Sequence, residues 1–454
     1  MKILVSVLWL SIFLNASSIS LSSPTLDEAL NILKTENLEI KAATLDVKSA
    51  KEDEDSVSGM HWGKLDFIQD VARSNDAGNV FGFKLTSREA TFGDFGFSEF
   101  NPALPPATLL QTQPNDLNYP DDRNYFQSKL RYEVPLFTGF ALSSYSEIME
   151  SMTKMKSLEK EEVINEKIYQ LRKSYYDMAL LNGSIQNLTK ILDNIETLEN
   201  TTQNMIDVGY AKKVDLLEVK AKKGNVERLL MQMSSNKKLL YHYISFLLNK
   251  QITSITPPQA EIKMPIMSDE DILAQNIDIQ KASTGLVIRE SMLSADQAAY
   301  YPTLGAFGEV ATADDTFLGD AVDHQAYTIG ARLTWNIFNG GIDSAKIEKS
   351  KLEHLKMKSQ VELAKHGIAL QLAKTKTEIA TADEEIASLT KELDLADAIY
   401  KNYEGRYREK LSSMNDVIIK QSSQIEKILQ LQMAKNKRNE KIFALEKLAN
   451  KGQK

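Results

Sequence analysis

The sequence predicts a mixed α and β fold that is mostly helical and is built from two internal repeats. Leu136–Gly139 recurs as Ile337–Gly340 at an offset of 201 positions, and the same ungapped register extends from about Tyr125 to Lys250. Two proline-free stretches of roughly 70 residues predict very long helices, and segments of about ten residues that alternate between apolar and polar side chains predict strands.

Composition excludes several classes of protein. The chain has 454 residues, no cysteine and a net charge of −8. Without cysteine there are no disulfides, thiolate metal sites or lipid-modified cysteine anchors. The acidic balance argues against a nucleic-acid-binding protein, which needs a basic face.

The N-terminus has the pattern of a secretory signal peptide, which we assign to residues 1–20. Lys2 precedes the apolar run Ile3–Leu14, and small residues follow at Ala16 and Ser18. The alternative is a short buried helix. No other apolar run is long enough to span a bilayer as a helix.

The two repeats predict the domain organisation. The first repeat covers residues 21–260 and the second covers residues 261–454. Upstream of the strands, Asn37–Ile40 matches Asn276–Ile279 at an offset of 239. This offset is 38 larger than the offset of 201 that holds downstream, so the first repeat has 38 extra residues. These fall in a proline- and glycine-rich stretch, about 75–123, which we expect to be a long extracellular loop. Its aromatic residues leave open whether the loop is packed and partly caps a pore, or is simply exposed.

Each repeat predicts a helix, two strands, a very long helix, a turn and another long helix. The first strands lie near Lys64–Arg73 and Thr303–Asp314, and the second strands alternate clearly over Phe126–Val134 and Tyr327–Trp335. Such a pattern is typical of membrane strands, although a half-buried strand of a soluble sheet has it too.

Two tryptophans favour the membrane alternative. Trp62 ends a helix just before the first strand, and Trp335 ends the last strand just before a helix. Both would lie at one rim of a barrel, where aromatic side chains meet lipid headgroups.

The long helices should span Gly139–Val208 and Gly341–Arg408, and about 70 helical residues reach roughly 105 Å. Shorter helices are expected over Thr25–Gly59 and Ser268–Tyr301. Apolar residues at a spacing of seven, then at alternating spacings of three and four, form a heptad seam, which predicts coiled-coil packing. They are Ile379, Ile386, Leu389, Leu393, Ala396, Tyr400, Tyr403 and Tyr407.

Four strands cannot close a barrel, so several chains must each contribute four. This organisation resembles the TolC family of outer-membrane channels over essentially the whole mature chain. The motifs that carry the resemblance are Val134–Gly139, its repeat at Asn336–Gly341, Val208-Gly209 followed by Asp215–Leu217, and Tyr301–Leu304.

The resemblance implies a homotrimer with a 12-stranded transmembrane barrel above a periplasmic tunnel of coiled-coil helices. It further implies a passive exit duct in the outer membrane, in contact with its lipid, a periplasmic adaptor protein and an inner-membrane pump. Type I protein secretion, rather than efflux of small molecules or metal ions, is one alternative. A purely structural periplasmic coiled-coil protein is another.

The resemblance also assigns roles to residues near the helix tips. The adaptor would dock at Val208, Gly209, Tyr210, Lys410 and Leu411. An acidic ring at the periplasmic aperture would use Asp215, Glu218 and Asp416, with Tyr407 as a closing contact. Lys410 stands where the family usually has glycine, and Ser412 replaces an expected arginine. The alternative for both aspartates is that they lie in the first turn of a helix, where negative charge is favoured.

No catalytic arrangement is apparent, so we predict that the protein is not an enzyme and uses no cofactor. The five histidines show no pairing at metal-ligand spacing, and we predict no metal site. They are His61, His242, His324, His354 and His366.

Overall fold

The computed structural model describes residues 23–258, 262–317 and 323–450. The predicted signal peptide lies outside these residues. The chain divides into two compact units. One is helical and comprises residues up to Lys48, Lys154–Thr284 and the chain from Ser359 onward. The other contains the strands and comprises Ser49–Thr153 and Gly285–Lys358.

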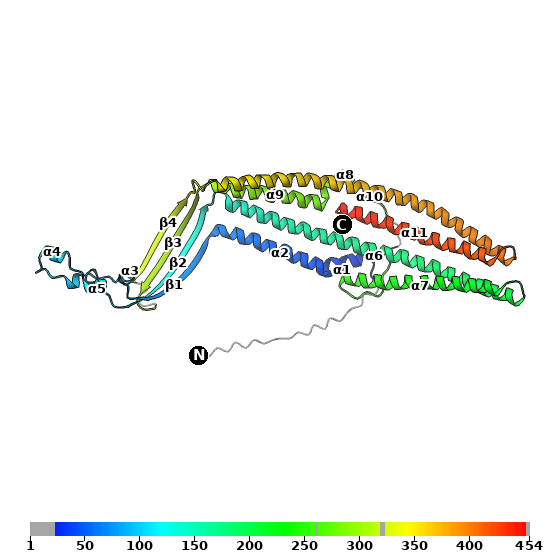
Figure 1. Cartoon of the computed structure of the whole chain (residues 1–454), viewed down its shortest axis with the longest axis horizontal. Coiled ribbons are helices and arrows are strands. Elements are labelled where there is room, and N and C mark those ends of the chain that lie inside the picture. Colours follow the sequence, from blue (N-terminus) through cyan, green and yellow to red (C-terminus); the bar gives the residue numbers. More distant parts are fainter. Residues whose placement is uncertain (1–22, 259–261, 318–322, 451–454) are drawn as a thin grey trace, which may run out of the picture. The chain divides into compact units, whose positions relative to one another are not determined.

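The two very long helices are confirmed. Helix α6 runs over Ala141–Asp207 and α10 over Ile342–Arg408, each with 67 residues. Each is followed by a turn and a second long helix, α7 (Lys213–Leu248) after α6 and α11 (Met414–Leu448) after α10 (Figure 1). None of the helices in the described ranges is long and apolar enough to cross a membrane.

The shorter helices differ from the prediction, because each is interrupted by an asparagine. The first pair is α1 (Leu26–Glu36) and α2 (Leu38–Gly59), and the second is α8 (Asp269–Gln275) and α9 (Ile277–Gln297). Asn37 and Asn276, between the helices of each pair, have extended backbone conformations. Their side-chain oxygens accept hydrogen bonds from the first turn of the following helix, which starts a new helix instead of continuing the old one.

The predicted heptad seam is largely buried in the helical unit. One apolar core joins the α6–α7 and α10–α11 hairpins near their turns, and it includes Tyr400 and Tyr407 of the seam. Its fully buried members on α6 and α7 include Leu188, Ile195 and Val226. A second core lies where α1 and α7 pack on α6, around Tyr175 and Leu247. Each helix buries a narrow stripe of apolar side chains in these cores, and this burial stabilises helices of such length.

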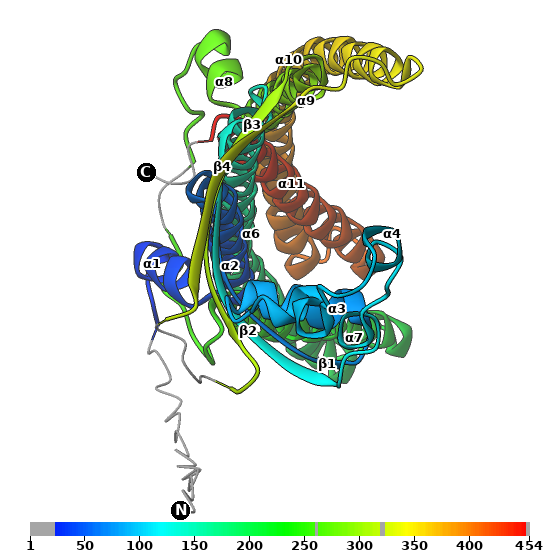
Figure 2. The same ribbon diagram turned by 90° about the vertical axis from the view of Figure 1, so that its left-hand side faces the viewer.

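Four antiparallel strands form one sheet in the order β1-β2-β3-β4 (Figure 2). The strands are β1 (Lys64–Ser74), β2 (Arg123–Phe137), β3 (Thr303–Asp314) and β4 (Gln325–Thr334). They match the predicted segments to within a few residues. Within the described residues β1 and β4 are edge strands, each paired on one side only.

The extra segment between β1 and β2 is partly helical, whereas a loop was expected. Helix α3 (Ala77–Thr86) begins at Asp76, whose carboxylate accepts a hydrogen bond from the backbone of Asn79. Short helical turns follow; they are η2 (Gly93–Phe95), η3 (Phe97–Glu99), α4 (Pro106–Leu109) and α5 (Asn115–Asn118). Phe83 stacks on Tyr125 with ring centroids 4.2 Å apart, and Phe81 meets Phe95 edge to face, so this part of the segment is packed. Phe92 remains exposed.

Candidate functional site

One face of the sheet is apolar and open to its surroundings. A single cross-strand row runs from Phe67 through Leu130 and Val310 to Tyr327, one residue from each strand. All four are at least half exposed, with values of 66%, 50%, 54% and 78%. A soluble sheet buries such a face in its core, so this face is suited to contact with an apolar medium.

The opposite face carries the charges. In the neighbouring row, Asp66 lies opposite Arg131, which lies opposite Glu309. Arg131 pairs with Glu133 at 2.6 Å, and Lys64 pairs with Asp66 at 2.9 Å. A hollow of about 480 Å³ opens on this side of the sheet. Its lining includes Lys64, Arg131, Glu133 and Arg332. This face is therefore suited to water.

Trp62 and Trp335 lie at the same end of the sheet. Trp62 precedes β1 and Trp335 follows β4, and in this antiparallel order the start of β1 and the end of β4 lie at one end. Both side chains are more than half exposed. The Trp62 carbonyl accepts a hydrogen bond from the Tyr132 hydroxyl at 2.5 Å, and the Trp335 indole donates to the Tyr300 carbonyl at 3.3 Å. Both contacts anchor the aromatic residues at the predicted rim.

The turns at the ends of the two hairpins have the same geometry at repeat-equivalent positions. Gly209 has φ +76° and Lys410 has φ +62°. The Tyr210 amide donates to the Met205 carbonyl and the Leu411 amide to the Arg406 carbonyl, both at 2.7 Å. These are the bonds of a helix C-cap that needs a left-handed residue. Lys410 therefore adopts the backbone conformation that glycine provides at Gly209, at the cost of steric strain.

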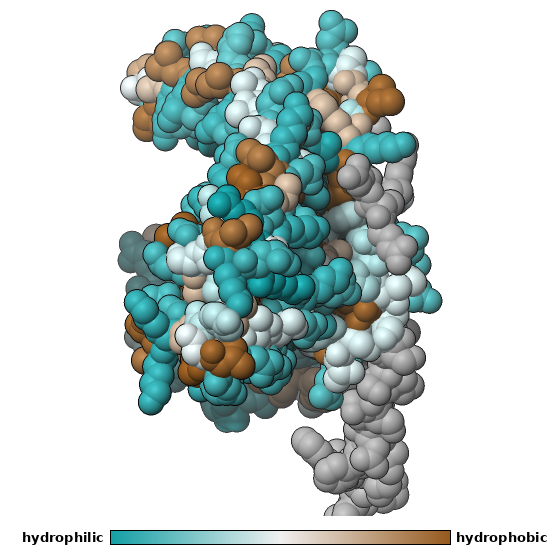
Figure 3. Space-filling model, turned by 90° about the vertical axis from the view of Figure 1, so that its right-hand side faces the viewer, coloured by the Kyte–Doolittle hydropathy of each residue, from teal (hydrophilic) through white to brown (hydrophobic). Residues whose placement is uncertain are grey.

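A contact between the two turns accompanies this geometry. The Lys410 ammonium lies 3.3 Å from the centroid of the Tyr210 ring, a cation–π arrangement. Val208, Tyr210 and Leu411 have largely exposed side chains. The surface seen from this end of Figure 1 is mostly hydrophilic, with isolated hydrophobic residues (Figure 3). The predicted docking residues are therefore brought together as an exposed pair of turns.

The two predicted aperture aspartates both cap helix N-termini. Asp215 accepts a hydrogen bond from the Lys212 amide at 2.8 Å in α7. Asp416 accepts from the Ser413 amide at 3.1 Å and from the Ser413 hydroxyl at 2.6 Å in α11. These Ser413 hydrogen bonds lower the pKa of the Asp416 carboxyl, so it is charged at neutral pH. Glu218 lies one turn beyond Asp215 on α7.

Tyr407 is buried beside Thr202 of the other hairpin. The two hydroxyls are 3.3 Å apart, and both side chains are almost fully buried. Burial raises the pKa of the Tyr407 hydroxyl, so it stays protonated. The sequence predicts a contact at Tyr407 but not its partner Thr202, because the two residues lie in different repeats and at positions that are not repeat-equivalent.

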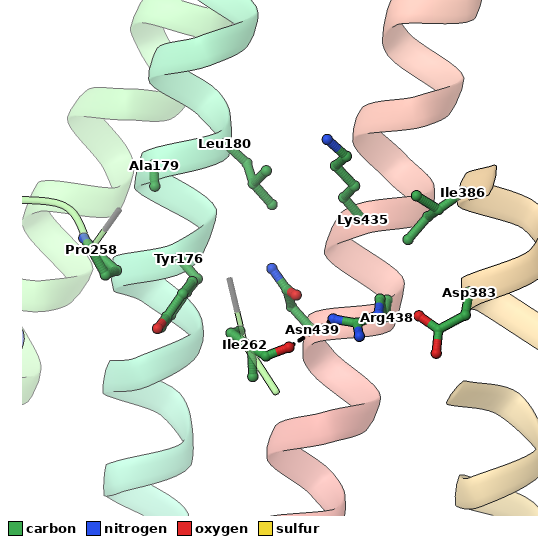
Figure 4. A pocket seen from close by; sticks show the side chains of 10 residues that line it. All are labelled: Tyr176, Ala179, Leu180, Pro258, Ile262, Asp383, Ile386, Lys435, Arg438 and Asn439. Atoms are coloured by element: carbon green, nitrogen blue, oxygen red, sulfur yellow. Dashed lines mark hydrogen bonds and ion pairs between the residues drawn. The ribbon is translucent and has the colours of Figure 1, made fainter. Parts of the chain in front are cut away.

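A cavity of about 350 Å³ lies among α6, α10 and α11 (Figure 4). The Arg438 guanidinium of α11 pairs with Asp383 of α10 and donates to the Ile262 carbonyl at 2.9 Å. Tyr176 and Leu180 line the cavity from α6. These contacts tie α11 to α10 and to the segment that joins the two repeats, so the cavity is part of the helix packing.

The structure also brings together three residues that lie far apart in the sequence. Glu89, Asp314 and His324 each offer a possible metal-ligand atom, and these atoms lie within 4.8 Å of one another. Spacing could not reveal the group, because its members come from the extra segment, the end of β3 and the start of β4.

Comparisons with known proteins identify similar folds. Residues 270–451 match the sequence profile of a family described as "Outer membrane efflux protein". Among solved structures, the MtrE outer membrane channel of Neisseria gonorrhoeae is 15% identical, with a TM-score of 0.76, covering 95% of this chain and 90% of that one. No curated protein matches the chain in sequence.

Two further structures have the same fold. The outer membrane protein VceC of Vibrio cholerae is 14% identical, with a TM-score of 0.76 and coverage of 94% of this chain and 96% of that one. The CmeC outer membrane channel of Campylobacter jejuni is 13% identical, with a TM-score of 0.75 and coverage of 94% and 86%. Their coverage extends the likeness in fold across both repeats.

Proposed function

We propose that the chain forms a passive exit duct of the outer membrane. The proposal starts from the resemblance predicted from the sequence, which is confirmed. Residues 270–451 match the outer membrane efflux protein family, and the chain has the fold of solved outer-membrane channels. The duct would release substrates that an inner-membrane pump and a periplasmic adaptor deliver. Its own residues would provide a path, and no catalysis.

The sheet is the observation that carries the proposal. One face exposes apolar side chains along every strand, the other carries charges, and both edges are free within the described residues. Backbone groups of free edges cannot face lipid, so the edges must pair with other copies. Three copies would give twelve strands, with the row from Phe67 to Tyr327 toward lipid and the charged face toward a water-filled lumen.

The exposed pair of turns is our proposed docking site for the adaptor. Val208, Gly209, Tyr210, Lys410 and Leu411 lie at the ends of the longest helices, and their side chains reach solvent. Trp62 and Trp335 would mark the rim of the barrel, at the level of the lipid headgroups. Asp215, Glu218 and Asp416 would line the periplasmic aperture in the trimer.

The absence of native cysteine makes the trimer directly testable. Phe67→Cys on β1 is combined in turn with Tyr327→Cys, Ile329→Cys or Ala331→Cys on β4. If β1 of one copy pairs with β4 of the next, at least one combination yields a covalent trimer on oxidation in outer-membrane fractions. Each single variant is the matched control and should not form one.

Two further measurements separate the duct from a purely structural coiled-coil protein. The purified trimer should conduct ions in planar bilayers, and Leu411→Asp should block export in cells while conductance persists. Phe92→Asp is the control, because Phe92 is also apolar and largely exposed but lies in the extra segment. Covalent trimers without conductance would refute the duct. The same assays with small-molecule and protein cargo distinguish efflux from type I secretion.

A further inference from the structure

Glu89, Asp314 and His324 come together between the end of α3 and the neighbouring ends of β3 and β4. Glu89 follows α3, Asp314 is the last residue of β3, and His324 immediately precedes β4. One ligand atom from each of the three lies within 4.8 Å of the other two. A carboxylate, a second carboxylate and an imidazole from three separate segments thus surround one point.

Local structure holds each of these residues in place. Arg88 has φ +58°, and the Glu89 amide donates to the Lys84 carbonyl at 2.9 Å, which closes the C-terminal turn of α3. Asp314 lies opposite Phe126 of β2 and is only 8% exposed. Neither carboxylate therefore depends on a flexible loop for its position.

The imidazole of His324 is held by a hydrogen bond from one of its two ring nitrogens. Its Nδ1 lies 3.2 Å from the Ala313 carbonyl oxygen. Because a carbonyl oxygen only accepts hydrogen bonds, Nδ1 must carry the proton, and in the neutral ring Nε2 keeps its lone pair. A histidine that ligates a metal commonly makes such a bond with its other nitrogen, which fixes the tautomer.

The surrounding charge also favours a divalent cation. Asp315 adds a third carboxylate beside Glu89 and Asp314, and the Arg123 guanidinium pairs with Glu89 and lies 3.5 Å from Asp315. With His324 neutral, the group has a net charge of −2. Arg123 Nε is buried without a hydrogen-bond partner in the described part of the chain.

We propose that Glu89, Asp314 and His324 bind a divalent transition-metal ion of the Zn²⁺ class. Mixed nitrogen and carboxylate ligands without thiolate suit Zn²⁺ and its neighbours, whereas Ca²⁺ and Mg²⁺ prefer oxygen alone. Tetrahedral bonds of about 2.1 Å place ligand atoms about 3.4 Å apart, so the group contracts on binding. Water completes the coordination. The ion ties the end of α3 to the connection between β3 and β4.

Zinc titration of the purified full-length protein in detergent tests the site. His324→Ala and Asp314→Asn should each weaken Zn²⁺ binding by about tenfold or more, because each removes a ligand. His366→Ala is the matched control, since His366 is exposed on α10, and it should bind as the parent does. Circular dichroism establishes that each variant is folded. Equal affinity in the parent and His324→Ala, or no binding by the parent, overturns the proposal.

A second readout detects the predicted link between α3 and the sheet. Trypsin cleaves after Arg88, next to the ligand Glu89. Zn²⁺ should slow this cut at least severalfold in the parent and in His366→Ala, but not in His324→Ala. Equal protection in all three proteins would also overturn the proposal, because it would show that the effect arises elsewhere.

Discussion

Asn37 and Asn276 make the same hydrogen bond in the two repeats. The Asn37 side-chain amide donates to the Leu247 carbonyl at 2.8 Å, and that of Asn276 donates to the Leu448 carbonyl at 3.1 Å. Both acceptors lie in the last turn of a long helix, α7 or α11, and are themselves separated by the 201-residue offset. Each asparagine thus caps one helix through its oxygen and holds the end of another through its nitrogen.

Replacing either asparagine by alanine should destabilise the protein by about 1–3 kcal/mol, because an N-cap and a buried hydrogen bond are lost together. The measurement is thermal or chemical unfolding followed by circular dichroism. Asn37→Ser and Asn276→Ser keep an uncharged capping oxygen but remove the amide donor, so each should cost less than the corresponding alanine variant. A loss of under about 0.5 kcal/mol in both alanine variants would contradict this double role.

The turn at Lys410 should be improved by glycine and loosened by the loss of Tyr210. Lys410→Gly removes left-handed strain of about 1–2 kcal/mol but also the cation–π contact, which is worth about 0.5–1 kcal/mol at an exposed site. Tyr210→Leu removes only the contact. We expect faster amide hydrogen exchange at both turns in Tyr210→Leu, and unchanged or slower exchange at the 410 turn in Lys410→Gly. The reverse order would show that strain does not govern this turn.

The repeat made much of the fold predictable. The offset of 201 read from Leu136–Gly139 also relates the ends of α6 and α10, and the left-handed residues Gly209 and Lys410. Alternation located the second strand of each repeat clearly, because a one-residue shift would exchange the apolar and charged faces.

Other features depend on contacts that no local pattern contains. A single asparagine is tolerated within a helix, so the breaks at Asn37 and Asn276 become evident only with their partners on α7 and α11. Tyr407 meets Thr202, and His324 meets Glu89, across different repeats. The roles of Asp215, Glu218 and Asp416 at an aperture stay predictions, because a ring of carboxylates exists only between copies of the chain.

Protease treatment of whole cells should cut the extra segment after Arg88 and leave Lys84 intact. Arg88 is exposed, whereas Lys84 lies within α3 and pairs with Asp94. An extracellular segment is the expected result if β1 runs outward and β2 returns. Arg88→Gln is the matched control and should abolish the cut. Cleavage only after the periplasm is opened would invert the predicted topology.

The proposed acidic ring at the periplasmic aperture should determine ion selectivity. In the trimer, Asp215 and Asp416 would bring six carboxylates together, and a ring of negative charge favours cations. The Asp215→Asn, Asp416→Asn double variant should therefore lower cation preference and weaken block by divalent ions in planar-bilayer recordings. Unchanged selectivity and block would leave both aspartates with only their capping roles.

The pH dependence gives a finer test of the same carboxylates. The Ser413 hydrogen bonds hold the pKa of Asp416 below its ordinary value of 3.8, so its charge is retained above that value and lost as the pH falls through the lowered pKa. Ser413→Ala removes the hydroxyl donor and should move the loss of cation preference to higher pH. Asp416→Asn is the control in which Ser413→Ala has no further effect. A midpoint that does not move on Ser413→Ala would show that Asp416 does not set the selectivity.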